Sequence, residues 1–290
     1  MFKDIFNFIL IMSFVSCYLM GGLGNQLFQI FATISAAIDA NLSPIFQYSQ
    51  VLNVGKPRPT YWDSFLERLK PFTTTAINVY SCPRIAEQGF EFRPIALYTS
   101  TPSCLFGYFQ SYKYFERHFD RIVELICLRE KQAEVVRKTQ LLSDSVPTVS
   151  MHFRLGDYVS LQDHHPVMPV KYYANSLKHL IDALSTDKFR VVYFNEKDDQ
   201  ETVNISISVL SRMFPNVEFV RADIDEDWEQ MLLMSVCRHN IIANSSFSWW
   251  GAYFNNNPNK IVCYPAVWFG PKSAGKNTRD LFPSGWRQIS

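Results

Sequence analysis

The segment HFRLGDY at 152–158 carries a cation where a phosphate can be held. It ends a stretch of alternating apolar and polar residues that predicts a strand, so Arg154 is expected at the strand's carboxyl end, followed by a tight turn at Gly156 and by Asp157. A guanidinium there can grip a phosphate through two parallel hydrogen bonds. Two plainer interpretations stay open: Arg154 forms a structural ion pair with Asp157, and His152 is a strand histidine with satisfied hydrogen bonds.

A second cluster, ANSSFSWWGAY at 243–253, predicts an anion site at the start of a helix. Asn244 to Ser246 follow a strand and supply the cap of the helix that begins at Phe247. The first backbone N–H groups of a helix, together with serine hydroxyls, can bind an anion without a metal. On the sheet edge that also holds Arg154, this cluster is expected to form half of a diphosphate pocket, whereas its two tryptophans are expected in the core.

The glycine-rich segment MGGLGNQLFQ at 20–29 does not match a dinucleotide-binding fingerprint. Such a fingerprint has a third glycine where this chain has Leu27, and an acidic residue ends the second strand where this chain has Gln47. The glycines and amides of this segment therefore need another explanation.

Metal ligands are sparse. The six cysteines are far apart and form no C-x-x-C pair, so a zinc site is not expected and the thiols are expected to be reduced. Asp223 and Asp225 have a spacing that can hold Mn²⁺ or Mg²⁺ on a nucleotide diphosphate. However, Asp225 or Asp227 also suits the N-cap of a helix that begins at Trp228. The cap is the preferred interpretation, so no metal site is predicted.

The elements that must position these residues alternate between strands and helices, which predicts an α/β fold with mostly parallel sheets covered on both faces. Two domains are expected, 1–146 and 147–290. Ligands of such sheets bind outside the carboxyl ends of the strands. In the second domain we expect strands at 148–154, 189–195, 217–220, 240–243 and 260–264, and helices at 169–185, 199–214, 227–239 and 246–256. In the first domain we expect strands at 14–20, 44–48 and 105–109, and helices at 26–40 and 112–128.

Composition excludes several classes of function. A formal charge of +1 gives no field that would attract nucleic acid. Hydrophobic content of 47% with charged content of 19% indicates a globular protein with well-filled cores. The apolar stretch from Ile5 to Met20 is too short to span a bilayer as a helix. The reduced thiols favour a cytoplasmic protein, as does the sequon at Asn244, because glycosylation there would harm the expected donor site. At most peripheral membrane contact is expected, through residues 2–11.

In seven collinear motifs along nearly the whole chain, the sequence resembles glycosyltransferase family 11, the α-1,2-fucosyltransferases. The motifs are MGGLGNQLFQ (20–29), GYFQSYKYF (107–115), HFRLGDY (152–158), PVKYY (169–173), LMSVCRHNIIANSSFSWWGAY (233–253), YPAVWF (264–269) and PSGW (283–286). The resemblance implies a GT-B architecture, with two Rossmann-like domains facing across a cleft. It also implies inverting transfer of L-fucose from GDP-fucose to an acceptor glycan of galactoside type, forming an α-1,2 linkage without a metal or other cofactor.

The same resemblance implies residue roles. The 20–29 loop would be the first domain's contribution to the cleft: Gly22 and Gly24 allow close backbone approach, Asn25 is the catalytic polar residue, and Gln26 bonds donor or acceptor. The second domain would hold the donor through Arg154, Tyr158, Asn244, Ser245, Ser246 and Phe247.

In the mechanism that this implies, Arg154 and backbone N–H groups stabilise charge that grows on the leaving β-phosphate. Asp157, His152 and a phosphate oxygen of the donor are the candidates for the base that activates the acceptor hydroxyl.

Departures from the family pattern keep two alternatives open. Leu155 stands where a second arginine is usual, and Gln230 stands where an acidic residue is common. The alternatives are transfer of another GDP-linked deoxysugar, and an inactive homologue that binds glycans or GDP. The acidic segment 196–201 is interpreted as a solvated loop and helix start.

Overall fold

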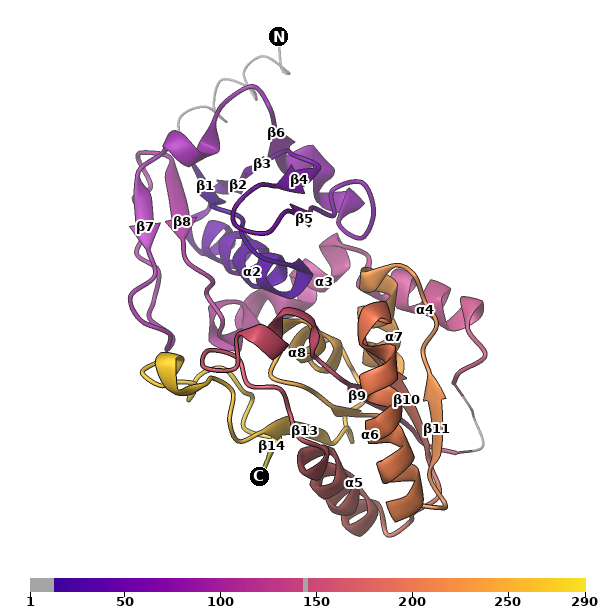
Figure 1. Cartoon of the computed structure of the whole chain (residues 1–290). Helices are drawn as coiled ribbons and strands as arrows, with labels where there is room; N and C mark the ends of the chain where they lie inside the picture. Colours follow the sequence, from indigo (N-terminus) through magenta and orange to yellow (C-terminus); the bar gives the residue numbers. More distant parts are fainter. Residues whose placement is uncertain (1–12, 143–145) are drawn as a thin grey trace. The chain divides into compact units, whose positions relative to one another are not determined.

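A computed structural model describes residues 13–142 and 146–290, so the prediction for residues 2–11 lies outside the described residues. The chain divides into two compact units: Met1–Arg129 with Asn277–Pro283, and Glu130–Lys276 with Ser284–Ser290. This division falls earlier in the chain than the predicted boundary at 146, and a segment near the C-terminus returns to the first unit. Each unit is built on its own parallel sheet, which confirms the α/β class (Figure 1).

The first unit has a four-stranded parallel sheet in the order β2-β1-β8-β7. These strands are β1 (Phe14–Cys17), β2 (Ser43–Pro44), β7 (Arg84–Ala86) and β8 (Ser103–Phe106), and the buried helix α2 (Leu23–Ala40) follows β1. Strand β1 is buried along its whole length, as its apolar sequence predicts.

The remaining elements of the first unit are short. They are β3 (Phe46–Gln47), β4 (Val51–Leu52), β5 (Arg58–Pro59), β6 (Thr73–Thr74), α3 (Phe119–Leu125) and the 3₁₀ turns η1 (Glu67–Phe72), η2 (Val79–Ser81), η3 (Tyr112–Tyr114) and η4 (Glu116–His118). The predicted single helix over 112–128 is wrong, because the chain there forms η3, η4 and α3. It then turns at Cys127 in a left-handed conformation (φ 52°) before α4 (Leu128–Lys138).

The prediction that α2 begins at Gln26 is also wrong, because the helix begins three residues earlier. Gly21 turns the chain into the helix with φ +80°, and a Cβ added there would lie 2.4 Å from Nδ2 of Asn25. The amide of buried Gln29 holds the preceding residue, since its Oε1 accepts from the Met20 N–H at 3.0 Å and its Nε2 donates to the Met20 carbonyl at 3.2 Å. A glycine turn and an amide clamp thus set the start of α2.

The returning segment Asn277–Pro283 is fixed to the first unit by Asp280, which is 7% exposed. Its carboxylate accepts from Nζ of Lys113 at 2.5 Å and from the backbone N–H of Phe92 at 3.1 Å. Its carbonyl accepts from Oγ of Ser111 at 2.6 Å.

The second unit has a six-stranded sheet in the order β11-β10-β9-β12-β13-β14, and every pair is parallel. Its strands are β9 (Thr148–His152), β10 (Arg190–Phe194), β11 (Glu218–Arg221), β12 (His239–Ile241), β13 (Val262–Pro265) and β14 (Arg287–Ile289). All but β14 were expected. From β9 the chain builds the sheet outward to β10 and β11, and it then returns to pair β12 with the other side of β9. The strand order therefore reverses between β9 and β12.

Helices cover both faces of this sheet, and all four match the predicted ranges closely. They are α5 (Val170–Leu184), α6 (Gln200–Met213), α7 (Asp227–Val236) and α8 (Ser246–Tyr253), with the 3₁₀ turns η5 (Gly156–Ser160), η6 (Lys197–Asp199) and η7 (Pro271–Ser273) in the loops. Val149 and Met151 of β9 join the core that includes α5 and α6. Ser150 faces the other way, where its Oγ accepts from Nδ2 of Asn240 at 2.7 Å. The same Nδ2 also donates to the Met234 carbonyl of α7 at 2.8 Å.

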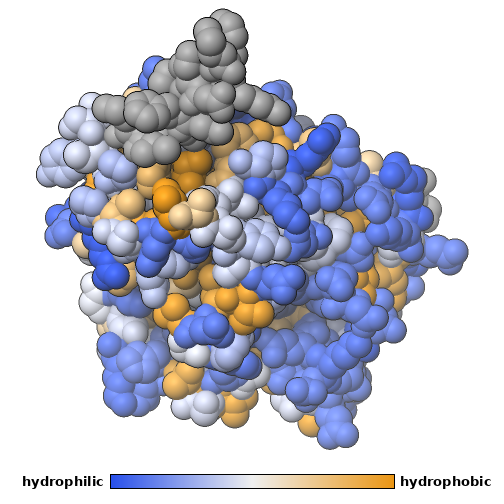
Figure 2. Space-filling model, turned by 90° about the horizontal axis from the view of Figure 1, so that it is seen from above, coloured by the Kyte–Doolittle hydropathy of each residue, from blue (hydrophilic) through white to orange (hydrophobic). Residues whose placement is uncertain are grey.

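Surface and membrane-related features are plain. On the face seen in Figure 2, hydrophilic residues dominate and the hydrophobic residues form small separate groups. Within the described ranges, none of the helices has the length and apolar character needed to cross a bilayer. All six cysteines are free thiols, as predicted, and Cys17, Cys104, Cys237 and Cys263 are buried.

Replacing Gln29 with Met tests the clamp on Met20, because Met keeps most of the side-chain volume but removes both hydrogen bonds. Leaving the Met20 N–H and carbonyl without these partners should lower the free energy of unfolding by about 2 kcal/mol. Urea denaturation followed by circular dichroism measures the change. The control is Gln88→Met, since Gln88 is exposed and its amide donates only to the Ala86 carbonyl at 3.3 Å. Equal stability of the two variants would contradict the role of the clamp.

Candidate active site at the strand-order reversal

Arg154 lies just beyond the carboxyl end of β9 and is held by two carboxylates. Its guanidinium forms ion pairs with Asp157, in the following turn, and with Glu196, which follows the neighbouring strand β10. The Arg154 side chain is only 16% exposed. The ion pair with Asp157 that sequence analysis left open is therefore present, and Glu196 is a second partner that sequence analysis missed.

Tyr158 links the loop after β9 to the loop after β12. The Arg154 guanidinium lies over its ring at 5.0 Å from the centroid, and its hydroxyl donates to the Asn244 carbonyl at 3.2 Å. The ring also stacks on His165, with ring centroids 4.8 Å apart. These contacts bring the two predicted motifs together on one sheet edge, at the position where the strand order reverses. Parallel α/β sheets bind ligands at such positions.

The start of α8 has the predicted cap. Ser245 is the N-cap residue, and its Oγ accepts from the backbone N–H of Phe247 at 3.3 Å. Asn244 is buried, and its Nδ2 donates to the carbonyls of Pro166 and Trp268 at 2.9 and 3.2 Å. The Asn244 side chain therefore fixes two neighbouring loops, and Ser246 occupies the first helical position. The part of this segment that can bind an anion is therefore the amino end of α8.

His152 is the last residue of β9 and is 7% exposed. Its ring lies 5.6 Å from the ring of Phe247, and within the described chain its buried Nδ1 has no hydrogen-bond partner. Burial, with a smaller contribution from the Arg154 charge, lowers the pKa of His152 to about 3. An imidazole with so low a pKa stays neutral and is a weak base, so His152 is poorly suited to take a proton from a sugar hydroxyl.

The loop after β10 supports the loop after β9. The Asp199 carboxylate accepts from the backbone N–H of Gly156 at 2.9 Å, and Glu196 reaches Arg154. The interpretation of 196–201 as a merely solvated segment is thus incomplete. The signal was present in the sequence, because Glu196 and Asp199 directly follow a predicted strand of the same sheet as Arg154.

The glycine-rich segment belongs to the first unit, where its polar side chains bond within that unit. Asn25 accepts at Oδ1 from Nε2 of Gln110 at 2.8 Å. Gln26 is buried, and its Nε2 donates to the carbonyls of Gly21 and Pro59 at 3.0 and 2.8 Å. Gln26 thereby acts as a structural tie between this turn and β5. Gly22 is the N-cap residue of α2, and Gly24 lies in its first turn.

The acidic segment before α7 does not form the predicted cap. Glu226, rather than Asp225 or Asp227, is the N-cap residue, and it makes no side-chain capping bond. Asp225 pairs with Lys197 at 2.5 Å, and Asp223 lies 3.5 Å from Arg221. Across residues 13–142 and 146–290, no group of three or more His, Cys, Asp or Glu side chains is arranged to hold a metal ion.

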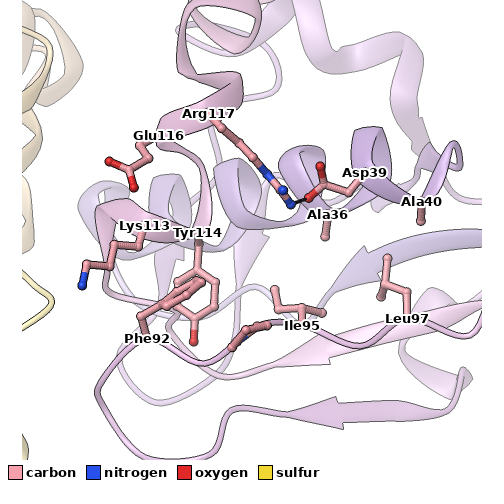
Figure 3. A pocket seen from close by; sticks show the side chains of 11 residues that line it. Ala36, Asp39, Ala40, Phe92, Ile95, Leu97, Lys113, Tyr114, Glu116 and Arg117 are labelled. Carbon is pink, nitrogen blue, oxygen red and sulfur yellow. Dashed lines mark hydrogen bonds and ion pairs between the residues drawn. The ribbon is translucent and has the colours of Figure 1, made fainter.

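A cavity of about 420 Å³ lies elsewhere in the first unit (Figure 3). Phe92 and Tyr114 form an aromatic wall with ring centroids 4.9 Å apart, and the Arg117–Asp39 ion pair closes another side. The cavity meets α2 at its last turns, whereas Asn25 is in the first turn. No predicted site residue lines it, so this cavity is separate from the predicted chemistry.

Comparison with known proteins identifies the family of the chain. Residues 24–289 match the family model described as Glycosyl transferase family 11. The Escherichia coli O-antigen biosynthesis glycosyltransferase WbnK is 31% identical over 61% of this chain and 59% of its own length. An Escherichia coli alpha-1,2-colitosyltransferase is 28% identical over 96% of this chain and 99% of its own. A Caenorhabditis elegans galactoside 2-alpha-L-fucosyltransferase is 25% identical over 92% of this chain and 77% of its own.

Among solved structures, POFUT1 in complex with GDP-fucose aligns over 88% of this chain and 97% of its own, with 10% identity and a TM-score of 0.46.

The low pKa of His152 predicts how stability changes with pH. In the unfolded chain a histidine binds a proton below about pH 6.5, whereas His152 in the folded chain does so only near pH 3. Stability is therefore lost as pH falls through this window, by about 2 kcal/mol between pH 7 and pH 5. A His152→Gln variant should lack this part of the loss. Because five of the six tryptophans lie in the second unit, urea titrations followed by tryptophan fluorescence report on it. If the wild type and the variant lose the same stability between pH 7 and pH 5, the prediction is refuted. Buried His239 is present in both proteins, so its own contribution to the pH dependence cancels in the comparison.

Proposed function

This chain belongs to glycosyl transferase family 11, and we propose that it transfers L-fucose from GDP-fucose to a hydroxyl of a galactoside-type acceptor, with inversion, forming an α-1,2 linkage. One observation carries the proposal furthest: Arg154 and the amino end of α8 share the sheet edge where the strand order reverses, joined through Tyr158. A guanidinium and a helix amino end together suit a diphosphate. The family and the curated relatives supply the sugar-transfer chemistry.

In the proposed reaction, Arg154 binds the donor's diphosphate and stabilises the charge that grows on the β-phosphate as the bond to the sugar breaks. The backbone N–H groups at the start of α8 assist in this role. The acceptor hydroxyl attacks the opposite face of the sugar ring, which inverts the anomeric carbon. Asp157 is 37% exposed and is a better base candidate than buried His152, and a phosphate oxygen of the donor is the alternative.

A second donor deserves a direct test, because the relative that aligns over 96% of this chain is named as a colitosyltransferase. Transfer of another GDP-linked deoxysugar would use the same phosphate contacts and a different sugar pocket. Calorimetric titration with GDP-fucose, GDP-mannose and UDP-galactose separates these cases without knowledge of the acceptor. Selective binding of GDP-fucose supports the proposal, whereas equal binding of GDP-sugars supports another deoxysugar. A protein that binds GDP-fucose and transfers its fucose to no β-galactoside would fit an inactive homologue.

Removing the proposed phosphate anchor tests the mechanism. Arg154→Ala should reduce turnover of GDP-fucose by about 10²-fold or more, since a transition-state charge loses its main counter-charge. The control is Arg190→Ala, which removes another arginine of this unit that is paired with a carboxylate, at 2.8 Å from Glu218 on the opposite edge of the sheet. Release of GDP in the presence of a panel of β-galactosides measures turnover. Comparable turnover rates for the two variants would contradict the assignment of Arg154 as the phosphate anchor.

Metal removal tests the absence of a cofactor. Because a guanidinium and helix N–H groups supply the positive charge in this proposal, turnover in excess EDTA should equal turnover in Mg²⁺ or Mn²⁺. A variant with both Asp223→Asn and Asp225→Asn should keep the wild-type rate. Loss of turnover in EDTA that Mn²⁺ restores, together with an inactive double variant, would favour the metal-dependent alternative instead.

A further inference from the structure

Carboxylates surround the Arg154 guanidinium, and a site that serves only to bind phosphate would not be expected to contain them. One guanidinium is paired with the carboxylates of Asp157 and Glu196, so the three groups together carry a net charge of −1. The carboxylate of Asp199 lies close by, on the backbone N–H of Gly156. A diphosphate that approaches Arg154 therefore meets two carboxylates that already bond both terminal nitrogens of its guanidinium, and the diphosphate has to compete with them for these nitrogens.

The two carboxylates differ in how firmly they are held. Asp157 lies three residues from Arg154 in the same short turn, and the backbone of that turn is tied to Asp199. Glu196 comes from a different loop, and its side chain is longer and 51% exposed. Its Oε2 sits beside Gly156, 3.0 Å from where a Cβ of that residue would lie, so the absence of a side chain at Gly156 leaves room for it. Glu196 is thus the partner that can leave Arg154 without unfolding the turn.

We propose that Glu196 is an affinity-setting residue: its carboxylate competes with the donor's diphosphate for the Arg154 guanidinium and is displaced when the donor binds. This role rests on the proposed function, because it assumes that Arg154 is the phosphate anchor. The competition weakens binding of the donor and of the product nucleotide alike, since both present phosphate oxygens to the same guanidinium. The residue therefore favours release of the nucleotide after transfer at some cost in donor affinity.

Calorimetric titration with GDP, and then with GDP-fucose, tests this role in the full chain. Glu196→Gln keeps the shape of the side chain and removes its charge, so the dissociation constant for GDP should fall about threefold to tenfold. The matched control is Glu201→Gln, which removes one negative charge from the exposed first turn of α6. The control should bind GDP as the wild type does, which separates a specific competition from a general change in charge.

The coupling to Arg154 gives a second readout. In an Arg154→Ala background, Glu196→Gln should no longer improve GDP binding, because the group for which it competes is gone. An unchanged or weaker affinity in the Glu196→Gln single variant overturns the role of Glu196 while leaving the proposed function intact. An equal gain in Glu201→Gln, or a gain that persists without Arg154, overturns it as well. If the wild-type chain binds neither GDP nor GDP-fucose, the proposed function itself fails, and the role of Glu196 fails with it.

Discussion

The parallel pairing of β9 with β12 is the constraint on which the second unit depends. These strands are 90 residues apart in sequence at the Ser150–Asn240 pair, and they adjoin only because the chain builds one half of the sheet and then returns to the starting strand. The buried amide of Asn240 holds the pairing by bonding Ser150 and the Met234 carbonyl, while Asn255 donates to its Oδ1 at 2.8 Å. A satisfied buried network of this kind fixes register, because a slip would leave several polar groups unpaired.

Because the strand order reverses between β9 and β12, the loops that follow these two strands run to opposite faces of the sheet. Between these loops, backbone and side-chain hydrogen-bond donors lie together at the carboxyl ends of the strands. The loop after β10 contributes carboxylates to the same edge. The result is a largely buried cation that is paired with two carboxylates and packed on an aromatic ring. Arg154 is thereby held in one orientation, and under the proposed function this reduces the entropy lost when the diphosphate binds.

Sequence analysis predicted the strands and helices of the second unit well because their signals are local: strands at a period of two, helices at 3.6, and capping residues at 244–246. It failed where tertiary contacts decide. The start of α2 depends on Gly21 and on a glutamine reaching back from Gln29, and the break near Cys127 needs a left-handed residue that no periodicity shows. Glu196 was missed because its partner is 42 residues away and adjoins it only through the pairing of β9 with β10. The burial that makes His152 a weak base likewise comes from the assembled sheet and the ring of Phe247.

The return of Asn277–Pro283 to the first unit has a consequence for biosynthesis. Asp280 supplies a buried carboxylate to Lys113 and to the backbone of Phe92, so the first unit lacks part of its interior until residues near the end of the chain have been made. On the ribosome, the first unit therefore gains these contacts only after residues 277–283 have emerged, later than in a chain whose N-terminal domain is one continuous segment. For the same reason neither unit corresponds to a single continuous gene fragment, and exchanging one of them between relatives requires two segments to be moved together.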